Sequence, residues 1–119
     1  MIIDKCRDIE ELRRLYNERP MPFQYDFDWL VNNPNLFCLY GEKGLLGFVT
    51  VQRENGVLTL SGTSVRKNLK GALFIINRVC ECFNEDMYSI TPLREAGFLL
   101  RKAGFKKIDN NTYRRLKNG

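Results

Sequence analysis

The apolar residues of the chain follow two spacings, which together predict a fold built from both strands and helices. Short β-branched or alternating runs predict strands at residues 1–6, 36–40, 45–52, 57–60, 87–91, 105–109 and 112–116. Apolar residues three or four positions apart predict helices at residues 9–16, 27–32, 70–83 and 93–103. The predicted order of elements is therefore β-α-α-β-β-β-α-β-α-β-β.

Local capping signals support two of these helices. Asp8 precedes the first helix as an N-cap, and Glu11 lies three residues later, as in a capping box. Thr91 and Pro92 predict the start of the last helix, with the threonine as cap and the proline in the first helical position. Gly104 follows that helix where a left-handed C-terminal residue is expected.

The connections between the strands predict their directions. The turns at residues 41–44 and 53–56 are so short that the three strands they join must form an antiparallel meander. The helix at 70–83 connects two strands by a right-handed crossover, so strands 57–60 and 87–91 are expected to be parallel neighbours. We expect one α/β (α+β) domain over residues 1–119, with a mixed, mostly antiparallel sheet flanked by helices.

The cysteine and histidine content excludes several kinds of site. The four cysteines, Cys6, Cys38, Cys80 and Cys82, contain no CxxC pair, and the chain has no histidine. These facts remove the usual zinc spacings and every histidine-based acid, base or triad. We expect core thiols and no metal site.

Charge and hydropathy indicate the surroundings of the protein. The sequence contains no apolar run long enough to span a bilayer and no cleavable signal, so a soluble cytoplasmic protein without membrane contact is expected. The net charge of +5 comes from the C-terminus, where only Asp109 opposes seven basic residues: Arg101, Lys102, Lys106, Lys107, Arg114, Arg115 and Lys117. This basic segment predicts either a contact with nucleic acid, with Phe105 and Tyr113 between the charges, or a sheet edge guarded by lysine and arginine.

The segment LTLSGTSVRKNLKGALF, residues 58–74, has the order strand, basic loop and helix. Consecutive backbone N–H groups at the start of a helix form a concavity that attracts anions, and glycine allows a phosphate to approach closely. The segment therefore predicts either a phosphate-binding loop or an exposed loop whose basic residues face water.

The order of elements resembles that of the GNAT superfamily of N-acetyltransferases, which bind acetyl-CoA. The family's loop Q/R-x-x-G-x-G/A is matched at Arg66 and Gly71, and the end of its last helix is matched at Lys102, Gly104 and Phe105 in LLRKAGF. The resemblance implies a CoA-diphosphate loop formed by Val65, Arg66, Lys67, Asn68, Lys70, Gly71 and Ala72.

Several positions depart from the family pattern. Leu69 replaces the first glycine of the loop, and Leu100 lies where the family has a tyrosine that reprotonates the thiolate. The strand at 57–60 holds no carboxylate, and Glu54 lies in the preceding turn as a solvated residue. We therefore expect a degenerate site with no catalytic residue and no cofactor. The alternative is an acetyl-CoA-dependent N-acetyltransferase in which Tyr88 or Tyr40 replaces the missing acid.

A second, narrower resemblance is to small GNAT-like virion and head-assembly proteins of short-tailed bacteriophages. It is carried by Leu60-Ser61-Gly62 followed by the basic Arg66-Lys67. This resemblance implies a bacteriophage head or virion assembly factor that acts by binding a protein component, in the host cytoplasm or in the virion. Nucleic acid is the other partner considered, and the sequence does not determine the oligomeric state.

Overall fold

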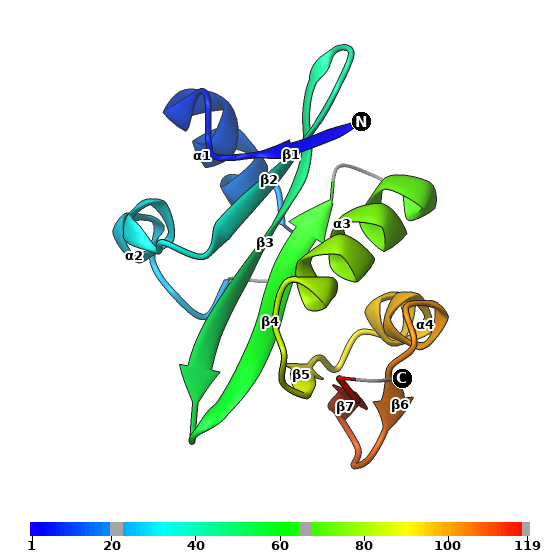
Figure 1. Ribbon diagram of the computed structural model, residues 1–119. Helices are drawn as coiled ribbons and strands as arrows, with labels where there is room; N and C mark the ends of the chain where they lie inside the picture. The colour runs from blue at the N-terminus through cyan, green and yellow to red at the C-terminus, as the bar shows by residue number, and fades with distance from the viewer. Residues whose placement is uncertain (20–22, 65–67, 118–119) are drawn as a thin grey trace.

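The computed structural model describes residues 1–19, 23–64 and 68–117, and seven strands of these residues form one sheet (Figure 1). The strands are β1 (Ile2–Asp4), β2 (Leu36–Gly41), β3 (Gly44–Glu54), β4 (Val57–Ser64), β5 (Met87–Ile90), β6 (Lys106–Lys107) and β7 (Thr112–Arg115). The helices are α1 (Ile9–Asn17), α2 (Phe27–Asn32), α3 (Leu69–Glu81) and α4 (Arg94–Lys102). This order confirms the prediction from the sequence.

The strands lie in the order β1-β2-β3-β4-β5-β7-β6. The pair β4–β5 is parallel and is connected through α3, whereas every other described pair is antiparallel. The predicted meander and the predicted parallel neighbours are both confirmed. The Asn55-Gly56 turn takes φ values of 52° and 83°, the left-handed conformation that a two-residue hairpin turn requires.

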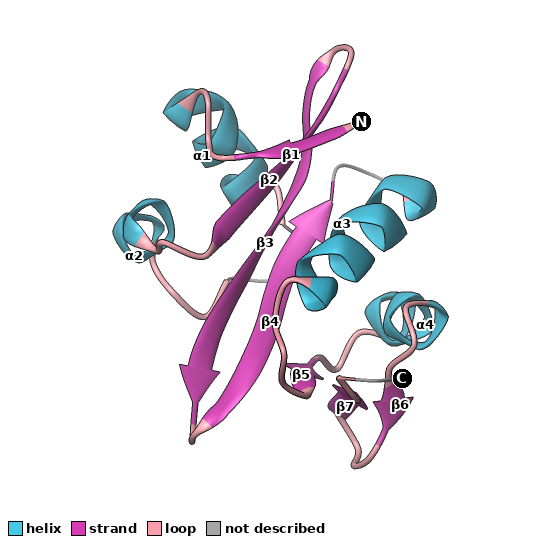
Figure 2. Ribbon diagram, viewed as in Figure 1, coloured by secondary structure: helices cyan, strands magenta, loops and turns pink. Residues whose placement is uncertain are grey.

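Helices cover both faces of the sheet (Figure 2). The alternation of side chains along β3 divides the core, because Phe48 faces α1 and α2 whereas Val49 faces α3 and α4. The core on the α1–α2 face contains Leu12, Leu15, Phe23, Leu30, Cys38, Tyr40, Leu45 and Phe48. The core on the α3–α4 face is larger and includes Leu39, Val51, Leu58, Leu60, Ile75, Ile76, Val79, Met87, Leu100, Phe105 and Tyr113.

The start of the first helix follows the prediction only in part. The Asp8 carboxylate accepts hydrogen bonds from the backbone N–H groups of Glu10 and Glu11, at 3.0 and 3.3 Å, as expected of an N-cap. The capping box is wrong, because the Glu11 carboxylate accepts instead from the backbone N–H of Leu45, at 3.0 Å. Glu11 thus joins α1 to the β2–β3 hairpin rather than to its own helix start.

The start of the last helix differs from the prediction, whereas the residue after its end agrees with it. The helix α4 begins at Arg94 with Leu93 as its cap residue, so the assignment of Thr91 as cap and Pro92 as first helical residue is wrong. The Thr91 hydroxyl oxygen accepts from the backbone N–H of Leu93 at 3.1 Å, which makes a local turn before the helix. Gly104 has a φ of 90°, as predicted.

The strand β4 is longer than predicted and extends through Ser61 and Gly62 to Ser64. A Cβ atom on Gly62 would meet the backbone carbonyl oxygen of Phe48, so only glycine allows β3 and β4 to approach this closely. The pairing of β4 with β5 ends earlier, because only Leu58 and Thr59 have partners, Met87 and Tyr88. Beyond these residues the two strands diverge.

Gly97 on α4 permits close packing of this helix on β7. A Cβ atom at this position would collide with the hydroxyl group of Tyr113. We expect Gly97→Ala to destabilise the protein by about 1–3 kcal/mol in urea unfolding, although alanine favours the helix itself. In a Tyr113→Phe background the same substitution should lose most of its cost, because the clashing oxygen is gone. An equal cost in both backgrounds would contradict this account of the packing.

Candidate functional site

A cleft of about 1140 Å³ opens where β4 and β5 diverge. Its walls come from β2, β3, β4, β5, α3, α4, and the end of α1 with the segment that follows it. The Ser89 hydroxyl donates a hydrogen bond to the Leu60 carbonyl at 2.8 Å and so bridges the two strands where the cleft begins. A site of this size and position can hold a small ligand.

The lining of the cleft is mainly apolar. Leu39, Val49, Leu60, Ile75, Ile76, Leu99 and Leu100 belong to it, together with the more exposed Leu69, Ile90 and Phe98. The ionisable groups among the described lining residues are Glu18, Arg19, Arg94 and Glu95. Leu100, at the position where the resemblance expects an acid, is buried and cannot transfer a proton. The described lining therefore lacks the tyrosine that the resemblance predicts.

The predicted phosphate loop is described in part. Val65, Arg66 and Lys67 lie outside the described residues, and Lys70 is exposed. Asn68 is the N-cap of α3, and its side-chain oxygen accepts from the backbone N–H of Gly71 at 2.9 Å. Asn68, Leu69 and Ala72 line the cleft.

This cap changes what the start of α3 can bind. A phosphate at a helix N-terminus is held by N–H groups of the first turn that have no partner within the helix. Here the Asn68 side chain already occupies the N–H of Gly71. A Cβ atom on Gly71 would lie 3.0 Å from both the Asn68 side-chain oxygen and a Leu39 methyl group, so close packing explains the glycine. Within the described part of the loop, the N–H of Gly71 is therefore already bonded within the chain.

Arg19 reaches the cleft from the segment after α1. Its Nη1 atom donates to the carbonyl of Gly62 at 2.9 Å, and its guanidinium lies 4.6 Å from the centre of the Phe23 ring. Burial lowers the pKa of Arg19. Sequence analysis missed this residue, because the bond joins positions 43 residues apart and no local pattern marks it.

Glu54 is not the solvated turn residue that the sequence suggested. It ends β3, and one oxygen of its carboxylate accepts from the side chains of Gln24, Tyr25 and Gln52 at 2.7, 3.0 and 2.9 Å. Burial and the bond to Glu54 raise the pKa of Tyr25. The Tyr25 ring stacks on Trp29 at 3.7 Å, so the carboxylate fixes this aromatic segment against the sheet.

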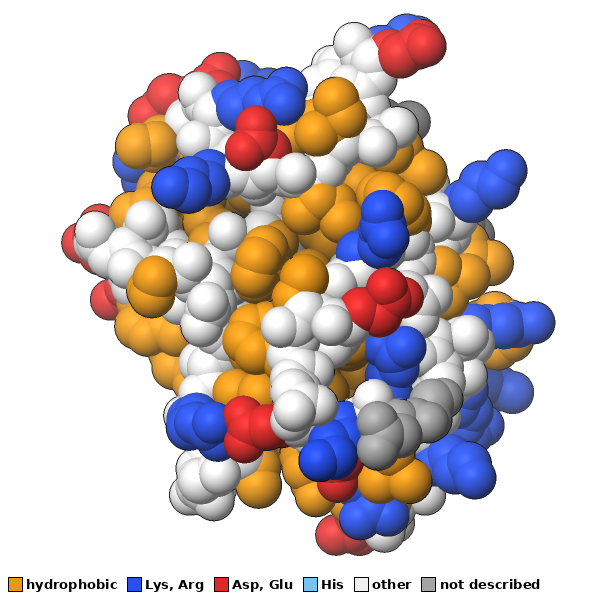
Figure 3. All heavy atoms as spheres, in the orientation of Figure 1, with side chains coloured by type: hydrophobic (Ala, Val, Ile, Leu, Met, Phe, Trp, Pro, Cys, Tyr) orange, Lys and Arg blue, Asp and Glu red, His pale blue; other side chains and the backbone are white. Residues whose placement is uncertain are grey.

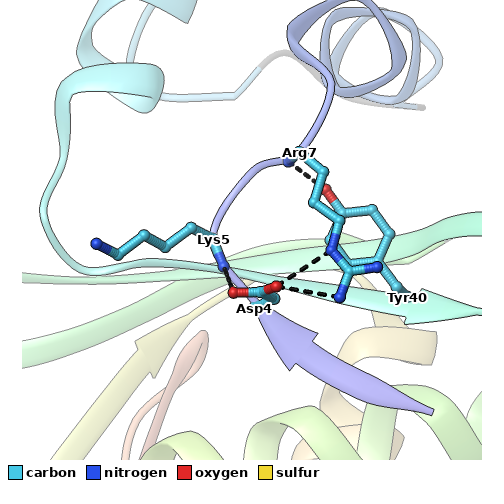
Figure 4. Close-up of polar contacts among 4 residues, drawn as sticks. All are labelled: Asp4, Lys5, Arg7 and Tyr40. Atoms are coloured by element: carbon cyan, nitrogen blue, oxygen red, sulfur yellow. Dashed lines mark hydrogen bonds and ion pairs between the residues drawn. The ribbon is translucent and has the colours of Figure 1, made fainter.

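Neither alternative acid faces the cleft. The Tyr40 hydroxyl accepts from the backbone N–H of Arg7 at 2.7 Å, and the Arg7 guanidinium lies over the tyrosine ring (Figure 4). Asp4 holds that guanidinium by an ion pair of 3.0 Å and accepts from the backbone N–H of Lys5. Tyr88 is half-buried on β5 and does not line the cleft. Tyr40 thus fastens β2 to the segment that enters α1.

The cysteines do not form a reactive centre among the described residues. Burial, with a contribution from neighbouring Cys6, raises the pKa of the Cys38 thiol to about 12, and burial also raises the pKa of Cys80. Cys82 is exposed. In residues 1–19, 23–64 and 68–117, no group of three or more metal-ligating side chains occurs, and no helix is long and apolar enough to cross a membrane.

Comparison with solved structures identifies the fold. The chain aligns with a GNAT-family acetyltransferase from Streptococcus pneumoniae over 95% of each chain, at 12% identity and a TM-score of 0.65. It aligns with GCN5 of Tetrahymena over 98% of this chain and 96% of that one, at 12% identity and a TM-score of 0.66. These likenesses show that the protein has the GNAT fold.

A third solved structure is N-acetylglutamate synthase from Neisseria gonorrhoeae, in complex with coenzyme A and N-acetyl-glutamate. The alignment has 12% identity and a TM-score of 0.69, and it covers 97% of this chain but 34% of the synthase. The chain therefore spans about a third of the length of that enzyme. No protein-family model matches the chain, and no curated protein sequence does so either.

The Asn68 cap makes a prediction about stability. Asn68→Ala should lower the free energy of unfolding by about 1 kcal/mol in urea denaturation, because Gly71 N–H loses its acceptor. Asn68→Asp should retain the stability, since a carboxylate accepts the same bond and suits the helix dipole. Equal stability of the alanine variant and the parent would show that the cap is energetically unimportant.

The burial of Cys38 makes a prediction about reactivity. At pH 8 a thiol with a pKa near 12 is ionised in about one molecule in ten thousand, and only the thiolate reacts. We expect iodoacetamide to modify the exposed Cys82 well before Cys38, as followed by peptide mapping. In urea the two rates should become similar. Rapid labelling of Cys38 in the folded protein would contradict its burial.

Proposed function

We propose that this protein is a GNAT-fold protein that works by binding and does not transfer acetyl groups. The observation that carries the proposal is the buried Leu100 in the wall of the cleft, at the position of the expected acid. Acetyl transfer to an amine is accelerated by a group that takes a proton from the nucleophile and a group that returns one to the thiolate, together by roughly 10²–10⁴-fold. The described strand β4 offers no carboxylate, and Leu100 offers no proton.

The start of α3 supports the same conclusion. Asn68 satisfies an N–H that a diphosphate would need, and the exposed Leu69 adds a branched side chain beside it. Selection for acetyl-CoA binding would favour a small residue at position 69 and unoccupied N–H groups at the first turn.

We propose further that the binding role is in the assembly of a bacteriophage head or virion, with a protein component as partner. The support is the resemblance of Leu60-Ser61-Gly62 and its basic loop to small phage proteins. Gly62 has a physical role in this motif, since it allows β4 to lie against the carbonyl of Phe48. Expression in the host cytoplasm and incorporation into the virion are both compatible with this role.

The alternative function is acetyl-CoA-dependent N-acetyl transfer. Two observations favour it: the cleft between β4 and β5 is large, and the gonococcal synthase that shares the fold was solved with coenzyme A bound. Positioning of the reactants alone can accelerate a reaction considerably. This alternative requires measurable affinity for acetyl-CoA, so a binding experiment separates the two functions.

We expect no heat when acetyl-CoA is titrated into the protein at millimolar concentration, and no release of CoA in the presence of small amines. Leu69→Gly removes the branched side chain at the start of α3, and Leu69→Glu adds a negative charge there. Leu69 is exposed, so both variants should fold. Binding in the glycine variant alone would identify Leu69 as the obstruction.

A different result would contradict the proposal. Micromolar binding of acetyl-CoA to the unaltered protein, lost in Leu69→Glu, would place the cofactor at the start of α3. If CoA release by an amine accompanied that binding, the protein would be an acetyltransferase. The circular dichroism spectrum of each variant controls for misfolding.

A further inference from the structure

One half of a sheet face lies outside both cores. The core on the α1–α2 face draws its described members from α1, α2, β2, β3 and the segments beside them. The strands β5, β7 and β6 extend beyond these helices, and Figure 1 shows α1 and α2 at the opposite end of the sheet. No described helix covers this side of the three strands.

Six side chains form this surface, which we call the open face. The register places Tyr88 on β5 beside Arg114 on β7, and Arg114 beside Lys106 on β6. The next row contains Ile90 beside Thr112, and the backbone N–H of Ile108 donates to the Thr112 carbonyl at 2.9 Å. Side chains of directly paired residues point to the same face, so the open face is Tyr88, Ile90, Lys106, Ile108, Thr112 and Arg114.

The open face exposes aliphatic surface that the fold leaves unused. Ile90 is 61% exposed and Ile108 is 46% exposed, both high for β-branched apolar residues on a sheet. The two isoleucines lie in the same row, on either side of Thr112. A partner that covers this row removes apolar area from water.

The charges of the open face have one sign. Lys106 and Arg114 are its ionisable cations, and none of its six residues carries a carboxylate. The acidic residues nearest in sequence bond backbone groups. The Asp109 carboxylate accepts from the N–H of Asn110 at 2.7 Å, and the Asp86 carboxylate accepts from the N–H of Lys117 at 3.1 Å. Figure 3 shows further Lys and Arg side chains on the side of the molecule that carries α4 and β6.

We propose that the open face binds an acidic, amphipathic segment of a partner protein. Apolar side chains of the segment would cover Ile90 and Ile108, and its carboxylates would pair with Lys106 and Arg114. A second copy of this chain is a poor occupant, because each copy carries a net charge of +5.

Nucleic acid fits the open face less well than an acidic protein segment does. Single-stranded nucleic acid binds proteins by stacking its bases on exposed aromatic rings between basic residues. The two rings that the sequence placed among the C-terminal charges, Phe105 and Tyr113, are only 2% and 6% exposed and belong to the opposite core. The one ring of the open face, Tyr88, is half-buried, and the exposed apolar groups, Ile90 and Ile108, are aliphatic, which suits a protein.

The inference rests on the proposed function in one respect, since it names the class of protein that a binding role would engage. Of the six residues of the open face only Ile90 also lines the cleft, and the residues changed in the test, Lys106 and Ile108, do not. An acetyl-transfer assay therefore tests the proposed function alone, and a peptide-binding assay on the open face tests the present inference alone.

The test uses a fluorescein-labelled 14-residue amphipathic peptide of leucine and glutamate as the probe, followed by fluorescence anisotropy with the full chain. The double variant Lys106→Gln/Ile108→Ser alters two exposed residues of the open face. We expect it to weaken binding about tenfold, from the lost ion pair and apolar contact together.

The matched control is Lys5→Gln/Ile2→Ser at the β1 edge of the sheet, the edge opposite β6. It changes the same two residue types, since Ile2 is 58% exposed and Lys5 is exposed, and neither residue lines the cleft. The control variant should bind within about twofold of the parent, and a peptide in which lysine replaces glutamate should bind at least about tenfold more weakly.

Four outcomes would overturn the proposal: no binding of the leucine–glutamate peptide, equal loss in both double variants, equal binding of the lysine peptide, or tighter binding of oligo(dT) that depends on the same two residues. The last result would assign the open face to nucleic acid. Unfolding curves of both double variants establish that they remain folded.

Discussion

The short parallel contact between β4 and β5 is the constraint on which the functional part of this structure depends. Only two residue pairs join these strands before they diverge. Because α3 must cross from the end of β4 to the start of β5, its first turn is held over the gap. The Ser89 hydroxyl satisfies the Leu60 carbonyl that the separation would otherwise leave without a strand partner. The cleft thus begins where the backbone pairing of β4 and β5 ends.

Because of this origin, the cleft does not by itself require catalytic groups in its lining. The position of Leu100 is set by the packing of α4, and a leucine there contributes to the core on the α3–α4 face. The start of α3 is similar, because the Asn68 side chain caps the helix. It accepts a hydrogen bond from the Gly71 N–H, a group that could otherwise bind an anion. Each group serves the stability of the fold, which is consistent with a role in binding.

The sequence predicted the fold well because its elements depend on local chemistry. The Asn55-Gly56 turn, the Asp8 cap and Gly104 each need only neighbouring residues, and each was found as predicted. The errors arose where a distant residue competes. Glu11 has the spacing of a capping box, but its carboxylate accepts instead from the backbone N–H of Leu45, 34 residues away.

The candidate site was predicted less completely for the same reason. The position of Leu100 followed from the pattern at the end of α4, but the contacts of Arg19 and Glu54 link segments that are distant in sequence. Of the two interpretations of the basic C-terminus, the contact with nucleic acid placed Phe105 and Tyr113 between the charges, but both rings are buried in the core. Alternation along β7 assigns neighbouring residues to opposite faces, but the sequence does not say which face is covered.

The separation of the two cores by the sheet has a consequence for partial unfolding. The helices α1 and α2 pack on one face of the sheet, and α3 and α4 pack on the other. The two layers are therefore connected mainly through the backbone of the strands. The α1–α2 layer can therefore open as a cooperative unit while the α3–α4 layer stays closed. Such an opening has to break the bond between Glu11 and Leu45, so this one carboxylate couples the local melting of a helix to the fraying of the β2–β3 hairpin.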